Sequence, residues 1–173
     1  DTAPTSSTTL TMAMGDALAV CLMKKRDFKK EDFASFHPGG SLGKKLFIKV
    51  DDLLRKENLP VVSRETKLKD AILVMSEGRL GSVIIEDENK NVIALLSDGD
   101  LRRALMNDNF SMDCKVEDIA TKNPKRLKNK ELLASDALQI IEDYKIQLLI
   151  VTNENDKLVG VLHIHDLIEA GIK

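Results

Sequence analysis

An internal duplication constrains this chain more than any other feature. The segment from Val92 to Leu105 reads VIALLSDGDLRRAL, and 66 residues later the segment from Leu158 to Gly171 reads LVGVLHIHDLIEAG. A period this long indicates two copies of one supersecondary unit. Neither copy is long enough to bury a large core alone, so we expect the two copies to pack against each other. The same spacing relates other identical residues without a gap: Val50/Val116, Asp52/Asp118, Asp70/Asp136, Ala71/Ala137, Glu88/Glu154, Asn89/Asn155, Asp100/Asp166, Leu101/Leu167 and Ala104/Ala170.

Both copies predict the same order of elements, β-α-β-β-α, after a short helical turn. Helical spacing, short apolar runs and polar turns give the first copy a turn at 50–54 and elements at 60–62, 67–76, 82–85, 92–96 and 98–106. The second copy has its turn at 116–119 and elements at 125–127, 132–143, 148–151, 158–162 and 165–170. The sequence therefore predicts an α/β (α+β) fold made of two repeats related by a pseudo-two-fold axis.

The segment before the repeats predicts helices and no strand. Apolar residues recur at helical spacing from Leu10 to Met23, in a stripe broad enough to need cover on more than one side. Hydroxyl residues at 5–9 are suited to cap that helix, and Lys30 to Phe36 predicts a second, short helix with its two phenylalanines inward. This segment has too few residues for its own core, and the chain begins at Asp1 rather than Met. We therefore expect the last piece of an α/β domain from a longer protein, joined to the repeats through 47–54.

Composition narrows the classes of partner. The net charge is −2 and charged residues are 31% of the chain, so no basic excess points to nucleic acid or to an anionic membrane. Aromatic residues are 3% with no Trp, which argues against a platform for stacked bases. Cys21 and Cys114 stand far apart and fit a reducing cytosol better than a disulfide framework, and no apolar run reaches transmembrane length. We expect a cytoplasmic protein with neither nucleic acid nor membrane as a partner.

The end of each copy carries a motif. It consists of a strand, Gly or Ala, two apolar residues, Ser or Thr, two further residues and Asp. The first copy has Ala94 to Asp100, ALLSDGD, and the second has Gly160 to Asp166, GVLHIHD. With the duplication in register, this chain resembles the paired CBS domain, named from cystathionine β-synthase. The resemblance implies a first CBS domain at 46–110 and a second at 111–173.

Four motifs extend the resemblance over all 173 residues. They are PTSSTT followed by MGDALA, then HPGGSLGKKL, then DGDLRR, then GVLHIHDL. In this order and spacing they resemble the arabinose-5-phosphate isomerases of the sugar-isomerase (SIS) family. The resemblance implies an upstream SIS domain, of which 1–45 is the tail, that interconverts ribulose 5-phosphate and arabinose 5-phosphate. The product feeds synthesis of Kdo, an acidic sugar of lipopolysaccharide and some capsules. It also implies a homo-oligomer, a dimer or, in the full-length parent, a tetramer.

The resemblance also assigns roles in the first segment. The histidine of HPGG, His37, is the catalytic candidate, because an aldose–ketose isomerase needs a base near neutral pKa and help with ring opening. The alternative is a loop histidine that only caps a turn. Ser6 and Ser7 are the candidates for binding the sugar phosphate, and helix capping is their alternative. Because the upstream phosphate loop is missing, we expect this chain to be inactive by itself.

Ser97 and Asp100 are the strongest candidates for binding an effector. The resemblance implies that the hydroxyl contacts a phosphate and that the carboxylate accepts hydrogen bonds from two ribose hydroxyls. The alternative is a helix cap, because Ser-x-x-Asp is also a capping pattern. In the second copy His163 replaces the serine while Asp166 remains, which favours a role for the aspartate beyond capping. Arg102 belongs to a solvated helix surface unless a phosphate or sugar carboxylate gives it a partner.

These candidates are expected to meet in one central groove, since the pseudo-two-fold axis brings the strand ends of both repeats together. The first candidate ligand is cytidine-linked Kdo, the activated downstream product, which carries ribose hydroxyls and a phosphate. An adenine nucleotide is the runner-up, and no cofactor is required. His163 and His165 form a His-x-His pair that could hold zinc. A zinc site wants three or four ligands, so no metal is expected.

Three functional interpretations remain open at this point. The chain is the regulatory part of an arabinose-5-phosphate isomerase, a free-standing CBS nucleotide sensor, or a ligand-free dimerisation module. The motifs PTSSTT and HPGGSLG favour the first, because a simple sensor has no need of them. Ligand binding separates the third from the other two.

Overall fold

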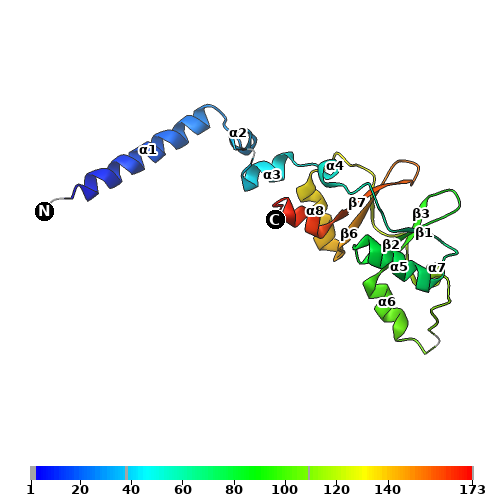
Figure 1. The fold of residues 1–173 in the computed structure, drawn as a ribbon. Coiled ribbons are helices and arrows are strands. Elements are labelled where there is room, and N and C mark those ends of the chain that lie inside the picture. The colour runs from blue at the N-terminus through cyan, green and yellow to red at the C-terminus, as the bar shows by residue number, and fades with distance from the viewer. Residues whose placement is uncertain (1–2, 38, 109, 173) are drawn as a thin grey trace. The chain divides into compact units, whose positions relative to one another are not determined.

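The computed structural model describes residues 3–37, 39–108 and 110–172 (Figure 1). The chain divides into two compact units, Asp1–Phe47 and Ile48–Lys173. The first unit contains helices and the second contains the two repeats. Each unit is described separately below.

The first unit has three helices within the described residues, α1 (Thr5–Lys25), α2 (Lys30–Phe36) and α3 (Ser41–Phe47). The sequence analysis did not predict α3. Helix α1 begins earlier than expected, with Pro4 at its N-cap and no side-chain cap. The hydroxyl residues therefore lie inside the first turn, where Ser7 Oγ donates to the Pro4 carbonyl at 3.0 Å and Thr9 Oγ1 to the Thr5 carbonyl at 2.9 Å. The expectation that they cap the helix is wrong, because these hydroxyls donate to carbonyls instead of accepting from backbone N–H groups.

The apolar face of α1 is exposed in this chain. None of its described residues is buried, and Leu10, Met14 and Leu18 keep 67%, 61% and 60% of their surface. Phe33 and Phe36 of α2 are exposed too, so the prediction that they point inward is wrong for this chain. A single helix cannot bury two faces of itself. The apolar surface of the unit is therefore without cover among the described residues.

Helix α1 also passes a test that the sequence analysis did not expect. Its 21 residues have a mean hydropathy of 1.2 and are long and apolar enough, by length and composition, to cross a membrane. Gly15 and Asp16 interrupt the apolar run, which is why no unbroken stretch of that length is visible in the sequence. A core helix of a soluble protein passes the same test.

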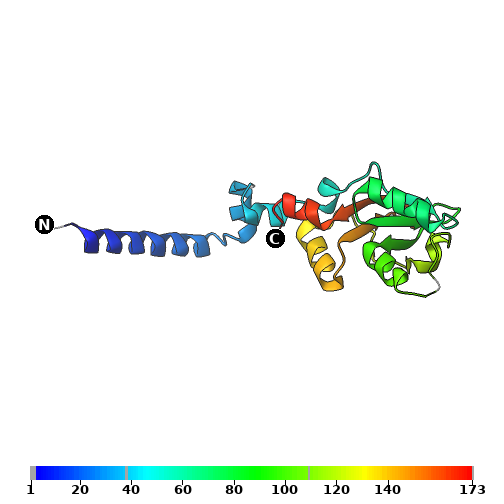
Figure 2. The same ribbon diagram turned by 60° about the horizontal axis from the view of Figure 1, so that its bottom comes forward.

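The second unit repeats one order of elements twice, which confirms the tandem α/β fold (Figures 1 and 2). The first repeat consists of α4 (Val50–Leu53), β1 (Val61–Ser63), α5 (Leu68–Gly78), β2 (Ser82–Glu86), β3 (Val92–Ser97) and α6 (Asp98–Leu105). The second consists of α7 (Val116–Ile119), β4 (Thr121–Lys122), β5 (Arg126–Leu127), α8 (Ala134–Tyr144), β6 (Leu148–Thr152), β7 (Leu158–His163) and α9 (Ile164–Glu169). Strand β4, of two residues, is the one described strand that the sequence analysis missed.

The repeats exchange their opening segments. The first sheet has the order β1-β2-β3-β4, so a strand that opens the second repeat completes the sheet of the first. The second sheet has the order β5-β6-β7, and Arg55, from the opening of the first repeat, forms an antiparallel bridge with Val161 of β7. In both sheets the first two strands are parallel and the next pair is antiparallel.

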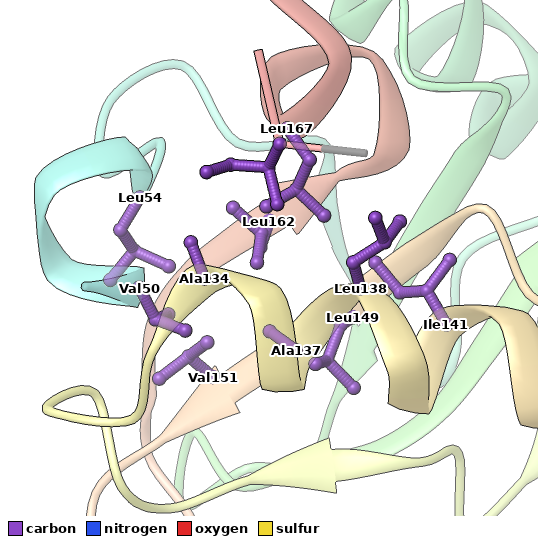
Figure 3. Close-up of a cluster of buried hydrophobic side chains, with 11 residues drawn as sticks. Val50, Leu54, Ala134, Ala137, Leu138, Ile141, Leu149, Val151, Leu162 and Leu167 are labelled. Atoms are coloured by element: carbon purple, nitrogen blue, oxygen red, sulfur yellow. The ribbon is translucent and has the colours of Figure 1, made fainter. Parts of the chain in front are cut away.

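The core follows the same exchange. Val50 and Leu54, from the first opening segment, pack in the hydrophobic cluster of the second repeat with α8, β7 and α9 (Figure 3). Val116, from the second opening segment, packs in the cluster of the first repeat. A third cluster joins both sheets and includes the repeat-related residues Ile84 and Ile150, which are 1% and 0% exposed. Burying each such side chain contributes roughly 1.5–3 kcal/mol. The expectation that the copies pack on each other is confirmed.

Candidate functional site

Ser97 ends β3 and caps α6. Its Oγ accepts a hydrogen bond from the backbone N–H of Asp100 at 3.3 Å. In return, Asp100 Oδ2 accepts from the Ser97 backbone N–H at 2.9 Å and from the Ser97 hydroxyl at 2.6 Å. This is a reciprocal capping box, in which an aspartate stands where glutamate or glutamine is more usual. The capping alternative for this pair is therefore realised, and a role in binding must use what the cap leaves available.

The cap leaves the second oxygen of Asp100 with other partners. Asp100 Oδ1 accepts a hydrogen bond from Thr121 Oγ1 at 2.9 Å and pairs with the guanidinium of Arg103. Asp100 is only 6% exposed, whereas the Arg103 side chain is 72% exposed. Burial alone would raise the pKa of Asp100, but hydrogen bonds from Ser97, Thr121 and Arg103 outweigh it and hold the pKa below its ordinary value. The carboxylate therefore stays ionised at neutral pH, and Arg103 is the partner with the most freedom to leave.

Asp100 lies in a cleft of about 560 Å³ between the two repeats, which we call the first cleft. This volume is within the range of small-molecule sites. Four basic and two acidic side chains line it, together with apolar residues from both repeats. A ligand with an anionic part, an apolar part and hydroxyl groups suits such a lining. The lining residues are Gly81, Ser82, Leu95, Ser97, Asp98, Gly99, Asp100, Arg102, Arg103, Thr121, Pro124, Lys125, Lys145, Ile146, Gln147 and Leu148.

The equivalent position in the second repeat is arranged differently. His163 caps α9, and its backbone N–H donates to Asp166 Oδ2 at 3.3 Å. The guanidinium of Arg55 binds the same carboxylate, with Nε 2.8 Å from Oδ2 and 3.1 Å from Oδ1. Neither His163 nor Asp166 lines the first cleft. The expectation of one groove holding both pairs is therefore wrong, because each pair belongs to its own half of the pseudo-symmetric unit.

The His-x-His pair is held by local contacts. His163 Nδ1 accepts a hydrogen bond from the His165 backbone N–H at 3.2 Å, and the two rings stack with centroids 5.0 Å apart. Burial and then the neighbouring charge of His165 lower the pKa of His163, which is 7% exposed. Within the described residues, no three His, Cys, Asp or Glu side chains are grouped to hold a metal ion. His163 is thus a neutral acceptor in a helix cap.

The candidates of the first unit lie on its helices. Ser6 and Ser7 are exposed in the first turn of α1. His37 is exposed at the C-cap of α2, with its ring centroid 4.7 Å from that of Phe33. Pro38, of the same motif, lies outside the described residues. These positions leave the hydroxyls and the imidazole accessible to whatever the unit packs against.

Several residues of the site were not found from the sequence. Arg103, rather than the predicted Arg102, contacts Asp100, although both line the first cleft. Thr121 was missed because β4 has no periodic signal, and Arg55 was missed because its contact depends on the strand exchange. The register of the duplication pairs Arg55 with Thr121, and that pairing was the available signal.

Comparison with known proteins defines the class. The sequence matches the CBS domain family over residues 50–107 and 116–173. The chain belongs to that family and carries two CBS domains in tandem. The crystal structure of the CBS domain protein PAE2072 from Pyrobaculum aerophilum, complexed with AMP, is similar with a TM-score of 0.62 and 23% identity, over 69% of this chain and 90% of that one. At that identity the likeness supports the fold.

Longer relatives are similar over essentially the whole chain. An uncharacterised protein of Helicobacter pylori strain J99 is 52% identical over 173 residues, which is 100% of this chain and 52% of the relative. Arabinose 5-phosphate isomerase KdsD of Pseudomonas aeruginosa is 43% identical over 171 residues, which is 98% of this chain and 52% of that enzyme. The chain spans about half the length of the curated relatives it matches.

Proposed function

We propose that the CBS pair binds a ribonucleotide or nucleotide sugar in the first cleft and thereby regulates an arabinose-5-phosphate isomerase. The observation that carries the proposal is a buried, ionised carboxylate, Asp100, whose most exposed partner, Arg103, faces an open cleft. A carboxylate accepts two hydrogen bonds from vicinal ribose hydroxyls. In this proposal the ribose displaces Arg103 from Asp100 Oδ1, while the capping box keeps Asp100 Oδ2 in place.

The remaining lining suits the other parts of a nucleotide. Arg102 and the displaced Arg103 take the phosphate, next to the start of α6, where the helix dipole favours an anion. The base lies against apolar residues such as Leu95, Ile146 and Leu148, which come from both repeats. A ligand bound this way touches both CBS domains. Its binding energy can therefore alter how the two domains pack.

The effector we propose first is cytidine-linked Kdo, with an adenine nucleotide as the second candidate. The first follows from the likeness to arabinose 5-phosphate isomerases and from the logic of feedback by an activated product. The second is supported by the AMP in the related structure. Both carry the ribose hydroxyls and phosphate that the first cleft is suited to bind. No further cofactor is needed.

The first unit belongs, in this proposal, to the end of a SIS domain. The likeness to KdsD over 98% of this chain, and the exposed apolar face of α1, support this. His37 then acts as the acid–base group on a pentose phosphate, and Ser6 and Ser7 bind that substrate. The parent would be a cytoplasmic homo-oligomer supplying Kdo for lipopolysaccharide or capsule. Here α1 is a core helix of the parent and not a membrane span.

Two other functions are carried as alternatives. A free-standing nucleotide sensor would use the same cleft without an isomerase. A ligand-free dimerisation module is favoured by one specific observation, since Ser97, Thr121 and Arg103 already satisfy Asp100 without any ligand. Ligand binding discriminates this module from the proposal.

Calorimetry with CMP, cytidine-linked Kdo, AMP and ADP tests the proposed function. We expect at least one of them to bind below millimolar concentration. Losing a charge-assisted contact to ribose costs roughly 1.5–3 kcal/mol, so Asp100→Ala should lower affinity about tenfold or more. Asp70→Ala is the matched control, because Asp70 also stands in the first turn of a helix but outside the first cleft. If no nucleotide binds below millimolar concentration, the dimerisation module replaces the proposal.

A further inference from the structure

The two aspartates that end the repeat motifs have different partners, and the register of the duplication explains how. Arg55 stands 66 residues before Thr121, and Arg103 stands 66 residues before Glu169. Asp100 is contacted by the hydroxyl of Thr121 and by Arg103 of its own helix. Asp166 is contacted by the guanidinium of Arg55. The positive partner has therefore moved from the helix in the first repeat to the exchanged opening segment in the second.

The contact of Arg55 uses the groups of Asp166 that a ribose would need. A guanidinium presents parallel N–H donors to a carboxylate, much as a vicinal diol presents two O–H donors. Arg55 contacts both oxygens of Asp166, with Nε 3.1 Å from Oδ1 and 2.8 Å from Oδ2. These hydrogen bonds, and the nearby charge of Glu169, raise the pKa of Arg55. Asp166 thus already has the interaction that a ligand would supply.

The backbone of Arg55 fixes its guanidinium more firmly than the first repeat fixes Arg103. Arg55 exchanges two backbone hydrogen bonds with Val161 of β7, at 2.9 and 3.0 Å. Its side chain is 44% exposed, against 72% for Arg103, which contacts one oxygen of Asp100. A ligand can displace Arg103 by a change of side-chain rotamer. Displacing Arg55 breaks a bidentate ion pair anchored on a strand.

The surroundings of Asp166 are also less suited to a phosphate. Two glycines of the first cleft are replaced by large side chains at the related positions, Gln147 for Gly81 and His165 for Gly99. Three of the four basic residues of the first cleft lose their charge or reverse it. The replacements are Ile168 for Arg102, Glu169 for Arg103 and Leu59 for Lys125. Phosphate recognition depends on such cations, so the second half offers less space and less positive charge.

From this asymmetry we infer that the chain binds one phosphorylated ribonucleotide per CBS pair, in the first cleft only. Arg55 is the internal counter-ion that closes the second half. The inference rests on the proposed function, because it assumes that a nucleotide binds at all. It assigns to Arg55 and Asp166 a structural role instead of the effector-binding role predicted for Asp166 from the sequence.

Calorimetric titration of the chain with AMP and with CMP measures the stoichiometry. We expect one equivalent per chain, lost in Asp100→Ala. Arg55→Thr, which installs the residue of the related position, should change the affinity of that single event less than about twofold, because it does not touch the first cleft. Two equivalents per chain would overturn the inference and leave the proposed function standing. Absence of binding by either nucleotide overturns both.

Nuclear magnetic resonance of the unmodified chain gives a second test that does not depend on the folding of a variant. Adding AMP or CMP should shift the backbone amide signals of Ser97, Gly99 and Asp100 at low nucleotide concentration. The amide signals of His163, His165 and Asp166 should stay within the range of residues remote from the ligand. Comparable saturating shifts at both motifs contradict a single site.

Discussion

Thr121 donates a hydrogen bond to Asp100 at 2.9 Å although it belongs, in the sequence, to the second repeat. Strand β4 brings it there by pairing with β3, where Thr121 is the partner of Leu95. The carboxylate of the first motif is therefore positioned by both CBS domains. A ligand that changes the contacts of Asp100 acts on the junction between them.

Replacement of Arg103 separates its two proposed roles. In the free protein Arg103 covers Asp100, and in the complex it binds phosphate. Arg103→Ala should therefore leave the affinity for a nucleoside, cytidine or adenosine, unchanged or improved. Affinity for the matching monophosphate should fall roughly threefold to tenfold, since the lost contact is charged but partly exposed to solvent. Calorimetry with nucleoside and nucleotide in parallel measures the split.

The control for this variant is Arg64→Ala. Arg64 forms an ion pair of similar exposure with Glu117, outside the first cleft. It should alter neither affinity. Equal weakening of nucleoside and nucleotide in Arg103→Ala would mean that Arg103 only supports the fold of the cleft.

His163 should make stability depend on pH. Its pKa is lowered from 6.5 in the folded state, so the unfolded chain takes up the proton first as pH falls. The stability is complete above the unfolded value and is lost as pH falls below it toward the folded pKa. The melting temperature should drop between about pH 7.5 and about pH 5.5, and His163→Ser, with the residue of the first repeat, should drop less. Thermal denaturation followed by circular dichroism checks this.

Asp100 does not interfere with that measurement. Its pKa is lowered from 3.8, so the stability it contributes is present above that value and is lost only at lower pH. His37→Ser serves as the control, because His37 is exposed in the first unit. A pH dependence that is identical in the chain and in His163→Ser would show that the buried imidazole is not its source.

Gly160 is expected to be required where its repeat mate, Ala94, is not. A Cβ at Gly160 would lie 2.5 Å from the Arg55 carbonyl oxygen and 2.7 Å from Leu54 Cγ. Gly160→Ala should therefore lower the free energy of unfolding by about 1–3 kcal/mol through overpacking. Ala94→Gly, the matched change in the first repeat, should cost only about 0.5–1 kcal/mol, mostly in chain entropy. Urea denaturation of the two variants compares them, and equal costs would argue against the close approach of Arg55.

The isolated chain should not isomerise ribulose 5-phosphate. Its first unit has helices and no strand within the described residues, so substrate orientation by an upstream sheet and phosphate loop is missing. In a full-length parent, His37→Ala should reduce turnover about 100-fold or more if His37 is the acid–base group. A coupled assay of arabinose 5-phosphate formation measures both. Turnover by the isolated chain would refute the placement of the active site in the upstream domain.

The isolated chain should self-associate. Helix α1 exposes Leu10, Met12, Met14 and Leu18, each by 60% or more, and such a face seeks cover. Light scattering at tens of micromolar should therefore give a mass above that of one chain. The double variant Leu10→Glu with Leu18→Glu should shift the mass toward the monomer, while Leu73→Glu, in the second unit, should not. A monomer at every concentration contradicts the prediction.

The sequence predicted the repeat elements well because the duplication gives every apolar pattern twice. Strand β3 and helix α6 begin within one residue of their expected positions, and the Ser97–Asp100 cap was weighed before the structure was known. Strand β4 was not predictable, because two residues carry no periodicity. Helix α3 follows an HPGG motif that indicates a break rather than a helix start.

The parts of the site that were missed depend on tertiary structure. Which arginine reaches Asp100 is decided by helical geometry, since Arg103 lies three residues on and therefore on the same face, whereas Arg102 does not. The contributions of Thr121 and Lys145 come from the second repeat and depend on how the sheets pack. The separation of Asp166 from the first cleft follows from the exchanged Arg55, which a local motif does not reveal.

The exchange of opening segments has a consequence for the connectivity of the chain. The covalent order runs out of phase with the spatial order by one segment, since 48–59 completes the second domain and 116–122 the first. Cutting the chain between the repeats would leave each half with a foreign segment and without its own. A circular permutant that begins at Pro60 and carries 48–59 after Lys173 would restore the phase. Two contiguous domains would result, each separable by a single cut. Equally, two single-repeat chains could lend their opening segments to each other, so gene fusion of such a dimer would need no new contact.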